Sequence, residues 1–506
     1  MKITIISPKK EIFEDKRMEF WEFGFMATTA GLGSRKYSGT PLAIPILASL
    51  IPGQYDIEAI DENIEEINFD NKTDLVLLTF FTTSATRGYK IADIYRGKNV
   101  KVVIGGCHAS MESGETSIHA DAVAIGEAEV LLPRILHDFN NGRLQKFYRV
   151  EEEERPSLDN QPIPRFNCLK LKNYFNPTIQ TMRGCPMGCE FCTVRVHWGA
   201  KYRYKPIKKV VQEINELKSQ FGRNTFIMIV DDDIAANRER SKELFRALIP
   251  LKIQWMSQGS MAMAKDDEYL DLMVESGGTR MIMGFESISV NNLKEMKKNP
   301  NNKLQEFTFN ARKIQSFGVA IIGAFVFGFD GDDKTCFDNT ADFIVANSIA
   351  LPQLFALTPF PGTELTKRLE KENRILSRDW KYYTGSTVQF IPKLMTSQEL
   401  EDGYYYAIQK VYSYKNISRR MTGLWELWDK YAKREEHVLL KEKIDVILLN
   451  ENFRACAYSY RHCYHVDQEE EQYYKNELQQ TLKRLLTERS RLIEKIREKE
   501  LMSVAG

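Results

Sequence analysis

The chain has 506 residues, of which 43% are hydrophobic and 27% are charged, a composition typical of globular proteins and enough sequence for about three domains. Lys and Arg total 70 against 69 for Asp and Glu, so no overall field would attract nucleic acid or an anionic membrane. The first residues are strand-like and unlike a signal peptide, and no apolar run reaches membrane-spanning length. We therefore expect a cytoplasmic protein without a transmembrane segment and without a nucleic-acid partner.

Residues 1–145 alternate short apolar runs with helical patterns. Runs of this kind, rich in Val, Ile and Leu, indicate a parallel, doubly wound sheet that is buried on both faces. The five predicted strands are 2–7, 55–60, 75–80, 100–104 and 122–125.

Small and polar residues follow three of these strands, where ligands of parallel sheets bind. Glycine lets the backbone approach a large ligand, and hydroxyl groups can bond its amides or phosphate. The glycine fingerprint of dinucleotide-binding folds is absent after the first strand. For His108, a loop histidine whose hydrogen bonds are satisfied within the protein is an equal alternative to a cofactor contact. The candidate residues are Thr82, Thr83, Ser84, Gly105, Gly106, His108, Gly126 and Glu127.

Charge, prolines and a lack of periodicity predict a linker over residues 146–175. Behind it, residues 176–375 alternate strands and helices again. Six strands in this region predict an incomplete (β/α)6 barrel whose chemistry lies at the carboxyl ends of its strands. The predicted helices are 207–221, 238–248, 267–275, 304–317 and 334–347.

Cys185, Cys189 and Cys192 form a Cys-x-x-x-Cys-x-x-Cys motif directly after the first barrel strand. Three thiolates at this spacing can bind one iron–sulfur cluster, and a cluster of four irons would keep one iron open for a substrate or cosubstrate. A zinc site would need a fourth ligand, for which only His197 lies close in sequence, and redox thiol pairs lack the third Cys. The other cysteines are spread thinly, which fits a reducing compartment.

Carboxylates and glycines follow the later barrel strands. A carboxylate can bond an ammonium group or a ribose diol, and glycine allows an adenine to lie against the backbone. The alternative for the Asp231–Asp233 triplet is a helix N-cap with an acidic first turn. The candidate cosubstrate residues are Asp231, Asp232, Glu286 and Gly328.

Residues 376–506 form a mostly helical C-terminal domain, with patterns at 400–414, 423–432 and 472–500. Its aromatic residues can close a pocket over an apolar substrate or simply pack a core. Cys456, His462, Cys463 and His465 could compose a second metal site, although no Cys-x-x-Cys pair is present.

The cysteine motif, with Phe191 before its last Cys, resembles that of the radical S-adenosylmethionine (radical SAM) enzymes. Asp61-Glu62-Asn63, Gly105-Gly106-x-His108 and Gly126-Glu127 resemble the cobalamin-binding domain that precedes the barrel in one large class of these enzymes. Segments 230–237, 358–365 and 378–380 look like the branch that contains the hopanoid-lipid methylases. One departure is that the Asp-x-His-x-x-Gly motif, which supplies a lower cobalt ligand in other cobalamin domains, has no His here.

The resemblance implies three cofactors, namely a 4Fe-4S cluster, S-adenosylmethionine and cobalamin. It implies a methyltransferase in which a 5′-deoxyadenosyl radical removes hydrogen from an unactivated carbon and methylcobalamin supplies the methyl group. The substrate would be a small molecule or lipid, and the electron would come from an external donor such as flavodoxin or ferredoxin. At the barrel strand ends, the family binds S-adenosylmethionine.

Three alternatives remain open from the sequence. The same cofactors serve cyclases, ring-rearranging enzymes and carbon-coupling enzymes. A methylthiotransferase is disfavoured, because the first domain lacks a second Cys triplet and the C-terminus is not a small β-rich module. The third alternative is a non-enzymatic cobalamin-binding or redox-sensing module.

Overall fold

The computed structural model describes residues 1–11, 37–222, 225–296, 304–432, 434–458 and 463–505. Its first part is built on a six-stranded sheet in the order β3-β1-β4-β5-β6-β7, with every neighbouring pair parallel. The strands are β1 (Lys2–Ser7), β3 (Asp56–Asp61), β4 (Leu75–Thr79), β5 (Lys101–Gly105), β6 (Ala122–Ile125) and β7 (Phe147–Arg149).

Helices cover both faces of this sheet, because successive strand residues point to opposite sides and both sides are apolar. Leu75 and Leu77 pack with helices α2 (Ala43–Leu50) and α6 (Ala128–Asn140). Val76 and Leu78 pack on the other face with α3 (Ala85–Gly97). Two short helices, α4 (Cys107–Met111) and α5 (Ser113–His119), follow β5. The predicted doubly wound fold is confirmed.

The predicted linker is packed rather than extended through solvent. Strand β7 pairs with β6, and β8 (Tyr174–Asn176) pairs with β2 (Tyr37–Gly39). Between them, Leu158 and Phe166 are buried. The sequence did not predict this burial, because the prolines and charges of this segment remove any periodic apolar pattern.

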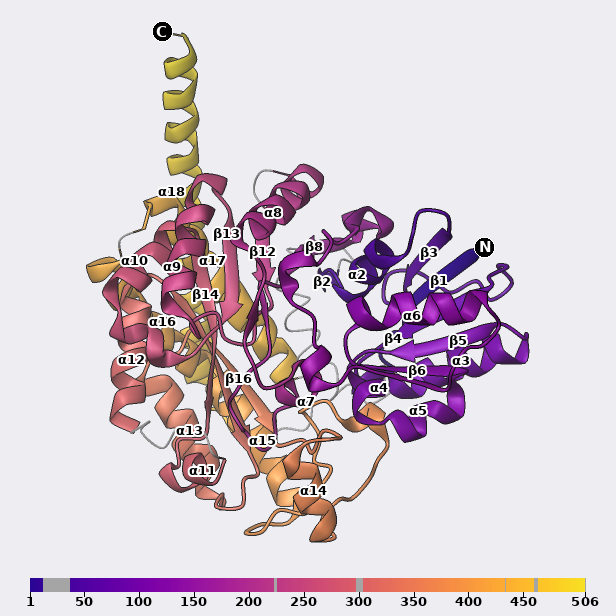
Figure 1. Cartoon of the computed structure of the whole chain (residues 1–506). Coiled ribbons are helices and arrows are strands. Elements are labelled where there is room, and N and C mark those ends of the chain that lie inside the picture. The colour runs from indigo at the N-terminus through magenta and orange to yellow at the C-terminus, as the bar shows by residue number, and fades with distance from the viewer. Residues whose placement is uncertain (12–36, 223–224, 297–303, 433, 459–462, 506) are drawn as a thin grey trace.

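The second part is a six-stranded sheet in the order β16-β15-β14-β13-β12-β9, again with all neighbours parallel. Its strands are β9 (Thr178–Ile179), β12 (Phe226–Ile229), β13 (Gln254–Gln258), β14 (Gly278–Glu286), β15 (Ala320–Phe327) and β16 (Leu351–Ala356). This is the expected incomplete barrel, and it stands beside the first sheet in Figure 1. The helices that connect its strands are α8 (Ile207–Phe221), α9 (Arg238–Leu248), α10 (Asp267–Glu275), α11 (Val290–Glu295), α12 (Leu304–Ser316) and α13 (Thr335–Ala346).

The C-terminal part is helical, as expected. After α14 (Glu364–Lys371) come α15 (Ser397–Val411), α16 (Tyr414–Tyr431), α17 (Glu436–Ala457) and α18 (Gln468–Ala505), whose last turns project away from the body in Figure 1. Helix α17 packs against the amino end of the barrel, where Arg280 of β14 donates to Glu442 at 2.9 Å. None of the helices in the described ranges combines the length and the apolar run needed to cross a lipid bilayer.

Candidate functional site

The three cysteines of the motif lie on a loop bracketed by a two-stranded antiparallel hairpin. Its strands are β10 (Met182–Arg183) and β11 (Arg203–Tyr204), and the short helix α7 (Val194–Trp198) lies between them. Gly184 begins the loop at φ +89°, and a Cβ there would lie 2.2 Å from the carbonyl oxygen of Lys201. Glycine is therefore required at this position of the loop.

The loop is tied to the barrel on two sides. Asp232 accepts a hydrogen bond from the Gly184 N–H at 3.0 Å, and Arg368 of α14 donates to Glu190 at 2.8 Å. Arg368 also binds Asp330, which follows β15, at 2.6 Å. These contacts hold the thiols at the carboxyl end of the barrel strands, where the sequence placed the chemistry.

The other two thiols and Glu286 lie near enough to Cys192 to affect its titration. Burial raises the pKa of the Cys192 thiol to about 12, with further contributions from Cys189, Cys185 and Glu286. Among the described residues, no three His, Cys, Asp or Glu side chains meet closely enough to hold a single metal ion. A four-iron cluster is wider than one ion, since each thiolate binds a different iron, so three thiols on one short loop can ligate it without meeting at a single point.

The three aspartates after β12 have different surroundings. Asp231 is buried and accepts from the backbone N–H groups of Thr181 and Met182 at 2.6 and 3.0 Å. It therefore supports the strand that leads into the thiol loop. Burial raises the pKa of the Asp232 carboxyl to about 7. Asp233 accepts from the N–H groups of Ala235 and Ser260, so it organises its own turn.

Glu286 ends strand β14 in an unusual backbone conformation. Its φ is +60°, and the pairing of β14 with β15 shifts register between Gly284 and Glu286. A left-handed conformation is uncommon for residues other than glycine, and strain of this kind gathers at functional sites. The bulge lies at the strand end nearest the thiol loop, and the Glu286 carboxylate is close enough to raise the pKa of Cys192.

Gly328 follows β15 at φ +106°. Its N–H donates to Asp332 at 2.9 Å, and a Cβ would lie 2.8 Å from Leu400. The next residue, Phe329, contacts Phe191 of the thiol loop with ring centroids 6.0 Å apart. Gly328 thus lies at the same end of the barrel as the thiols.

The hydroxyl residues after β4 form a short 3₁₀ turn, Thr82–Ser84, in which Thr83 is half-buried. His108 is fully buried beside this turn, with Nδ1 3.3 Å from the Thr82 hydroxyl and Nε2 2.9 Å from the Tyr89 hydroxyl. Burial lowers the pKa of His108 to about 4. Both ring nitrogens have protein partners, which favours the satisfied loop histidine over a cofactor contact.

Gly105, Gly106 and Gly126 line a cavity at the carboxyl ends of β4, β5 and β6. The volume of this cavity is about 120 Å³. Gly106 and Gly126 have φ of +93° and +113°, and a Cβ on Gly106 would lie 2.8 Å from the Thr79 hydroxyl. These glycines form one side of the hollow, and its other walls are mostly aliphatic.

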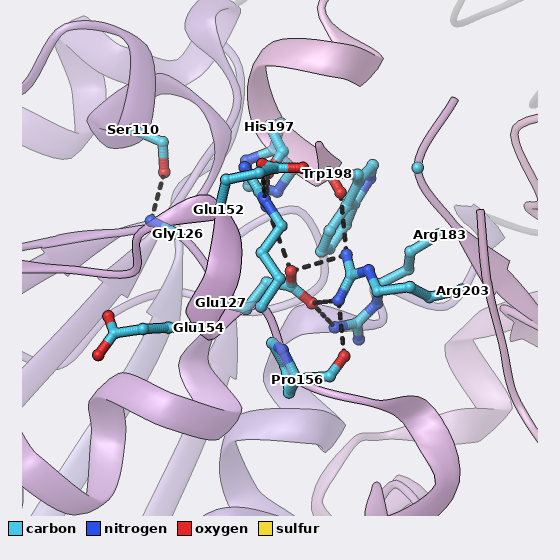
Figure 2. A network of polar contacts seen from close by, with 12 residues as sticks. Ser110, Gly126, Glu127, Glu152, Glu154, Pro156, Arg183, His197, Trp198 and Arg203 are labelled. Carbon is cyan, nitrogen blue, oxygen red and sulfur yellow. Dashed lines mark hydrogen bonds and ion pairs between the residues drawn. The ribbon is translucent and has the colours of Figure 1, made fainter. Parts of the chain in front are cut away.

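Glu127, at the edge of this cavity, binds arginines that come from outside the first sheet (Figure 2). Its side chain is fully buried and pairs with Arg183 at 2.7 Å, Arg203 at 2.8 Å and Arg155 at 3.3 Å. Glu129 and Glu152 pair with Arg183 and Arg155, so carboxylates balance the guanidinium groups. A buried network of this kind fixes geometry because every charge has a partner.

Sequence reasoning found Glu127 but none of its three arginines. No local signal marks Arg155 or Arg203, whereas Arg183 stands two residues before Cys185 and could have been noticed. His197, which the sequence suggested only as a possible zinc ligand, lines the glycine-lined cavity instead. Of the second candidate metal site, His462 lies outside the described residues.

The cysteine loop on a partial barrel and the glycine-lined cavity on a doubly wound sheet define a radical SAM enzyme with a second cofactor domain. Residues 179–344 match the sequence family described as the Radical SAM superfamily. Residues 363–496 match a second family, described as Domain of unknown function (DUF4070). A bacteriochlorophyllide d C-12(1)-methyltransferase from Chlorobaculum tepidum is 30% identical over 390 residues, which cover 76% of this chain and 85% of that protein. The chain belongs to the radical SAM enzymes, in the group that includes this methyltransferase.

Other relatives are more distant. The hopanoid C-2 methylase of Rhodopseudomonas palustris is 24% identical, with 67% of this chain and 66% of that protein covered. Among solved structures, the radical S-adenosylmethionine methyltransferase TsrM from Kitasatospora setae, with cobalamin and a 4Fe-4S cluster bound, has a TM-score of 0.63 at 13% identity. That match covers 90% of this chain and 99% of the TsrM chain. The cobalamin-dependent enzyme OxsB has a TM-score of 0.62 at 12% identity, over 96% and 84% of the two chains. These structures share the fold.

Proposed function

We propose that this radical SAM methyltransferase adds a methyl group to an unactivated carbon of a large, mostly apolar small molecule. The observation that carries the proposal is the direct connection between the thiol loop and the glycine-lined cavity through Arg183 and Glu127. This contact links the end of strand β6 to the thiol loop, and in this proposal a cofactor site lies on each side of it, so that one substrate can reach both. When bound, the cluster and S-adenosylmethionine supply a 5′-deoxyadenosyl radical, and methylcobalamin supplies the methyl group.

In this proposal, Cys185, Cys189 and Cys192 ligate the cluster. Glu286 and Asp232 bond the ammonium or ribose of S-adenosylmethionine, and Gly328 lets that molecule approach the backbone. Asp231 supports this site without contacting S-adenosylmethionine, because its carboxylate already accepts hydrogen bonds from the N–H groups of Thr181 and Met182. Cobalamin lies against Gly105, Gly106, Gly126 and Glu127 with Thr82, Thr83 and Ser84 at its edge, while His108 supports that edge.

The division of the chain follows these roles. We assign residues 1–145 to cobalamin, 146–175 to a connection, 176–375 to the radical SAM core and 376–506 to a helical domain that closes the barrel. Strand β7 extends the first sheet to Arg149, so that unit includes a few residues beyond the predicted boundary.

The substrate class rests on the relatives. One is named for a bacteriochlorophyllide and another for a hopanoid, and both of those molecules are large and polycyclic. A lipid or a comparable polycyclic compound is therefore the proposed substrate here, with flavodoxin or ferredoxin as the electron donor. A relative named as an anaerobic magnesium-protoporphyrin IX monomethyl ester cyclase, 25% identical, makes ring formation the second candidate.

The test is anaerobic turnover with S-adenosylmethionine, a reductant and extracts of a strain that lacks the gene. Methyl transfer predicts 5′-deoxyadenosine, S-adenosylhomocysteine and a product heavier by one methylene unit. Formation of 5′-deoxyadenosine and a cyclised product, without S-adenosylhomocysteine, would support the second candidate instead. Comparing metabolites of strains with and without the protein identifies the substrate.

A further inference from the structure

The cavity at the strand ends of the first sheet has one wall that does not belong to that sheet. Most of its lining comes from α2, α6 and strands β4 to β6, and includes Ile46, Leu47, Leu77, Leu131, Leu132 and Ile135. The remaining wall consists of Arg183, His197 and Trp198, which come from the thiol loop and helix α7. The cavity is thus closed by the radical SAM core.

His197 is an unusual member of this wall. Its side chain is 7% exposed, and Nδ1 is buried without a hydrogen-bond partner among the described residues. Burial lowers the pKa of His197 to about 3, with Arg183 and Arg155 adding to the effect, so the ring is neutral. A neutral imidazole carries one donor and one acceptor, and a buried polar atom that lacks a partner calls for a missing ligand or water.

The position of this ring is fixed by the network around Glu127 (Figure 2). Arg155 donates to the His197 carbonyl oxygen at 2.9 Å, and Arg203 donates to the Trp198 carbonyl oxygen at 2.9 Å. The guanidinium of Arg183 lies 4.5 Å from the centre of the Trp198 ring, and that ring packs edge-on against His197. The imidazole is therefore held against the cavity before any ligand arrives, as a preorganised binding group would be.

The chemistry of the cavity indicates which part of cobalamin it accepts. The rim of the corrin ring carries many amide groups, whereas the nucleotide tail ends in a flat aromatic base with little polar surface. Aliphatic walls with glycines between them match a flat apolar ring, and the polar groups gather at one end, at Glu127, Arg183 and His197.

We propose that His197 is a cobalamin contact supplied by the radical SAM core, and that it forms a hydrogen bond with the nucleotide tail of the cofactor. The proposal rests on the proposed placement of cobalamin at Gly105, Gly106 and Gly126. It makes helix α7, in which His197 follows Cys192 by five residues, a shared element of the two cofactor sites. Cobalamin then stabilises the contact between the first sheet and the thiol loop.

The experiment compares two ligands with the full-length protein. Hydroxocobalamin has the nucleotide tail, and diaquocobinamide has the same corrin without it. Affinities are measured by absorbance titration for the natural protein, His197→Phe, His197→Gln and the control His437→Phe, which changes a half-exposed histidine on α17. Iron content and far-ultraviolet circular dichroism report whether each variant folds.

We expect His197→Phe to bind hydroxocobalamin about tenfold more weakly, as the loss of one buried hydrogen bond predicts, and cobinamide with unchanged affinity. His197→Gln keeps a donor and an acceptor and should recover part of the loss, which also tests the proposal if the Phe variant does not fold. Equal losses for both ligands, or no loss for either, would overturn the tail contact. Failure of the natural protein to bind either ligand would instead refute the placement of cobalamin in the first domain.

Discussion

Oε2 of Glu127 accepts a hydrogen bond from Nη1 of Arg183 at 2.7 Å, and this contact joins the end of strand β6 to the residue before the thiol loop. Both side chains are buried, so the pair is shielded from solvent and salt. Since Arg183 precedes Cys185 by two residues, a shift of the first sheet would be transmitted to the cluster ligands. This buried contact therefore fixes how the thiol loop sits against the end of strand β6.

Glu127→Ala should strongly destabilise the protein. The substitution leaves Arg155, Arg183 and Arg203 without their common carboxylate, and breaking a buried ion pair costs about 3–5 kcal/mol. Denaturation followed by circular dichroism measures the loss. Glu154→Ala is the control, because Glu154 pairs with Arg134 on the surface and its removal should change stability little. Similar behaviour of the two variants would contradict the role of the network.

Replacing any one of Cys185, Cys189 or Cys192 with Ala should abolish cluster assembly and all cleavage of S-adenosylmethionine, because no other thiol lies on this loop. Iron and sulfide are quantified after anaerobic reconstitution. Cys168→Ala is the matched control, since burial raises the pKa of Cys168 to about 11 and keeps it a thiol in a turn of the connecting segment. Full iron content in Cys189→Ala would refute the ligand assignment.

Glu286→Ala should weaken S-adenosylmethionine binding by about one to two decades while the cluster remains, as expected for a charge-assisted hydrogen bond. Glu286→Gly should weaken binding equally but stabilise the fold by about 1 kcal/mol relative to Glu286→Ala, because glycine adopts a φ of +60° without strain. Equilibrium dialysis and chemical denaturation give the two quantities. Unchanged affinity in both variants would leave Glu286 a purely structural residue.

His108 should make the protein less stable as the pH falls below about 6.5, the ordinary pKa of a histidine side chain. The folded state holds its pKa near 4 by burial, so between these values the unfolded chain binds a proton that the folded chain does not. Stability is full above pH 6.5 and declines until pH 4, with a loss of about 2 kcal/mol between pH 7 and pH 5. Urea denaturation at these pH values measures the total loss, and His108→Gln should reduce it by about 2 kcal/mol. The buried His197, whose pKa is lowered to about 3, contributes a separate loss that this variant keeps.

The sequence predicted elements where local signals agree with packing. Helices α8, α9 and α10 begin and end where their patterns indicate, because Gly222 ends the first at φ +99° and the side chains of Asn237 and Asp266 cap the other two. Helix α17 was missed, since it is buried on several sides and shows no single apolar face.

Parts of the site could not be predicted for a different reason. The left-handed backbone of Glu286 leaves no trace in residue type, and the partners of Glu127 come from positions 155, 183 and 203. Such contacts between distant segments depend on how the two sheets are placed. The cysteine spacing and the glycines after strands are local features, so sequence alone predicted them.

The last prediction concerns the lower face of cobalt, which we expect to have no histidine ligand. Where other cobalamin domains carry Asp-x-His-x-x-Gly, the sequence from the end of strand β3 reads Asp61-Glu62-Asn63-Ile64-Glu65-Glu66, so Asn63 stands at the His position. Asp61 accepts from the Tyr174 hydroxyl at 2.7 Å, and Glu62 is paired with Arg87, so both already serve the first domain. If the nucleotide tail lies in the cavity beside His197, the nitrogen of its base is also kept from cobalt. Without an axial nitrogen donor, the oxidised cobalt is less stabilised, which favours release of the methyl group.

Electron paramagnetic resonance of the Co(II) form should therefore show no nitrogen superhyperfine splitting. A splitting that persists in His197→Phe would identify another nitrogen ligand, and one that disappears in that variant would make His197 the cobalt ligand; either result would refute the prediction.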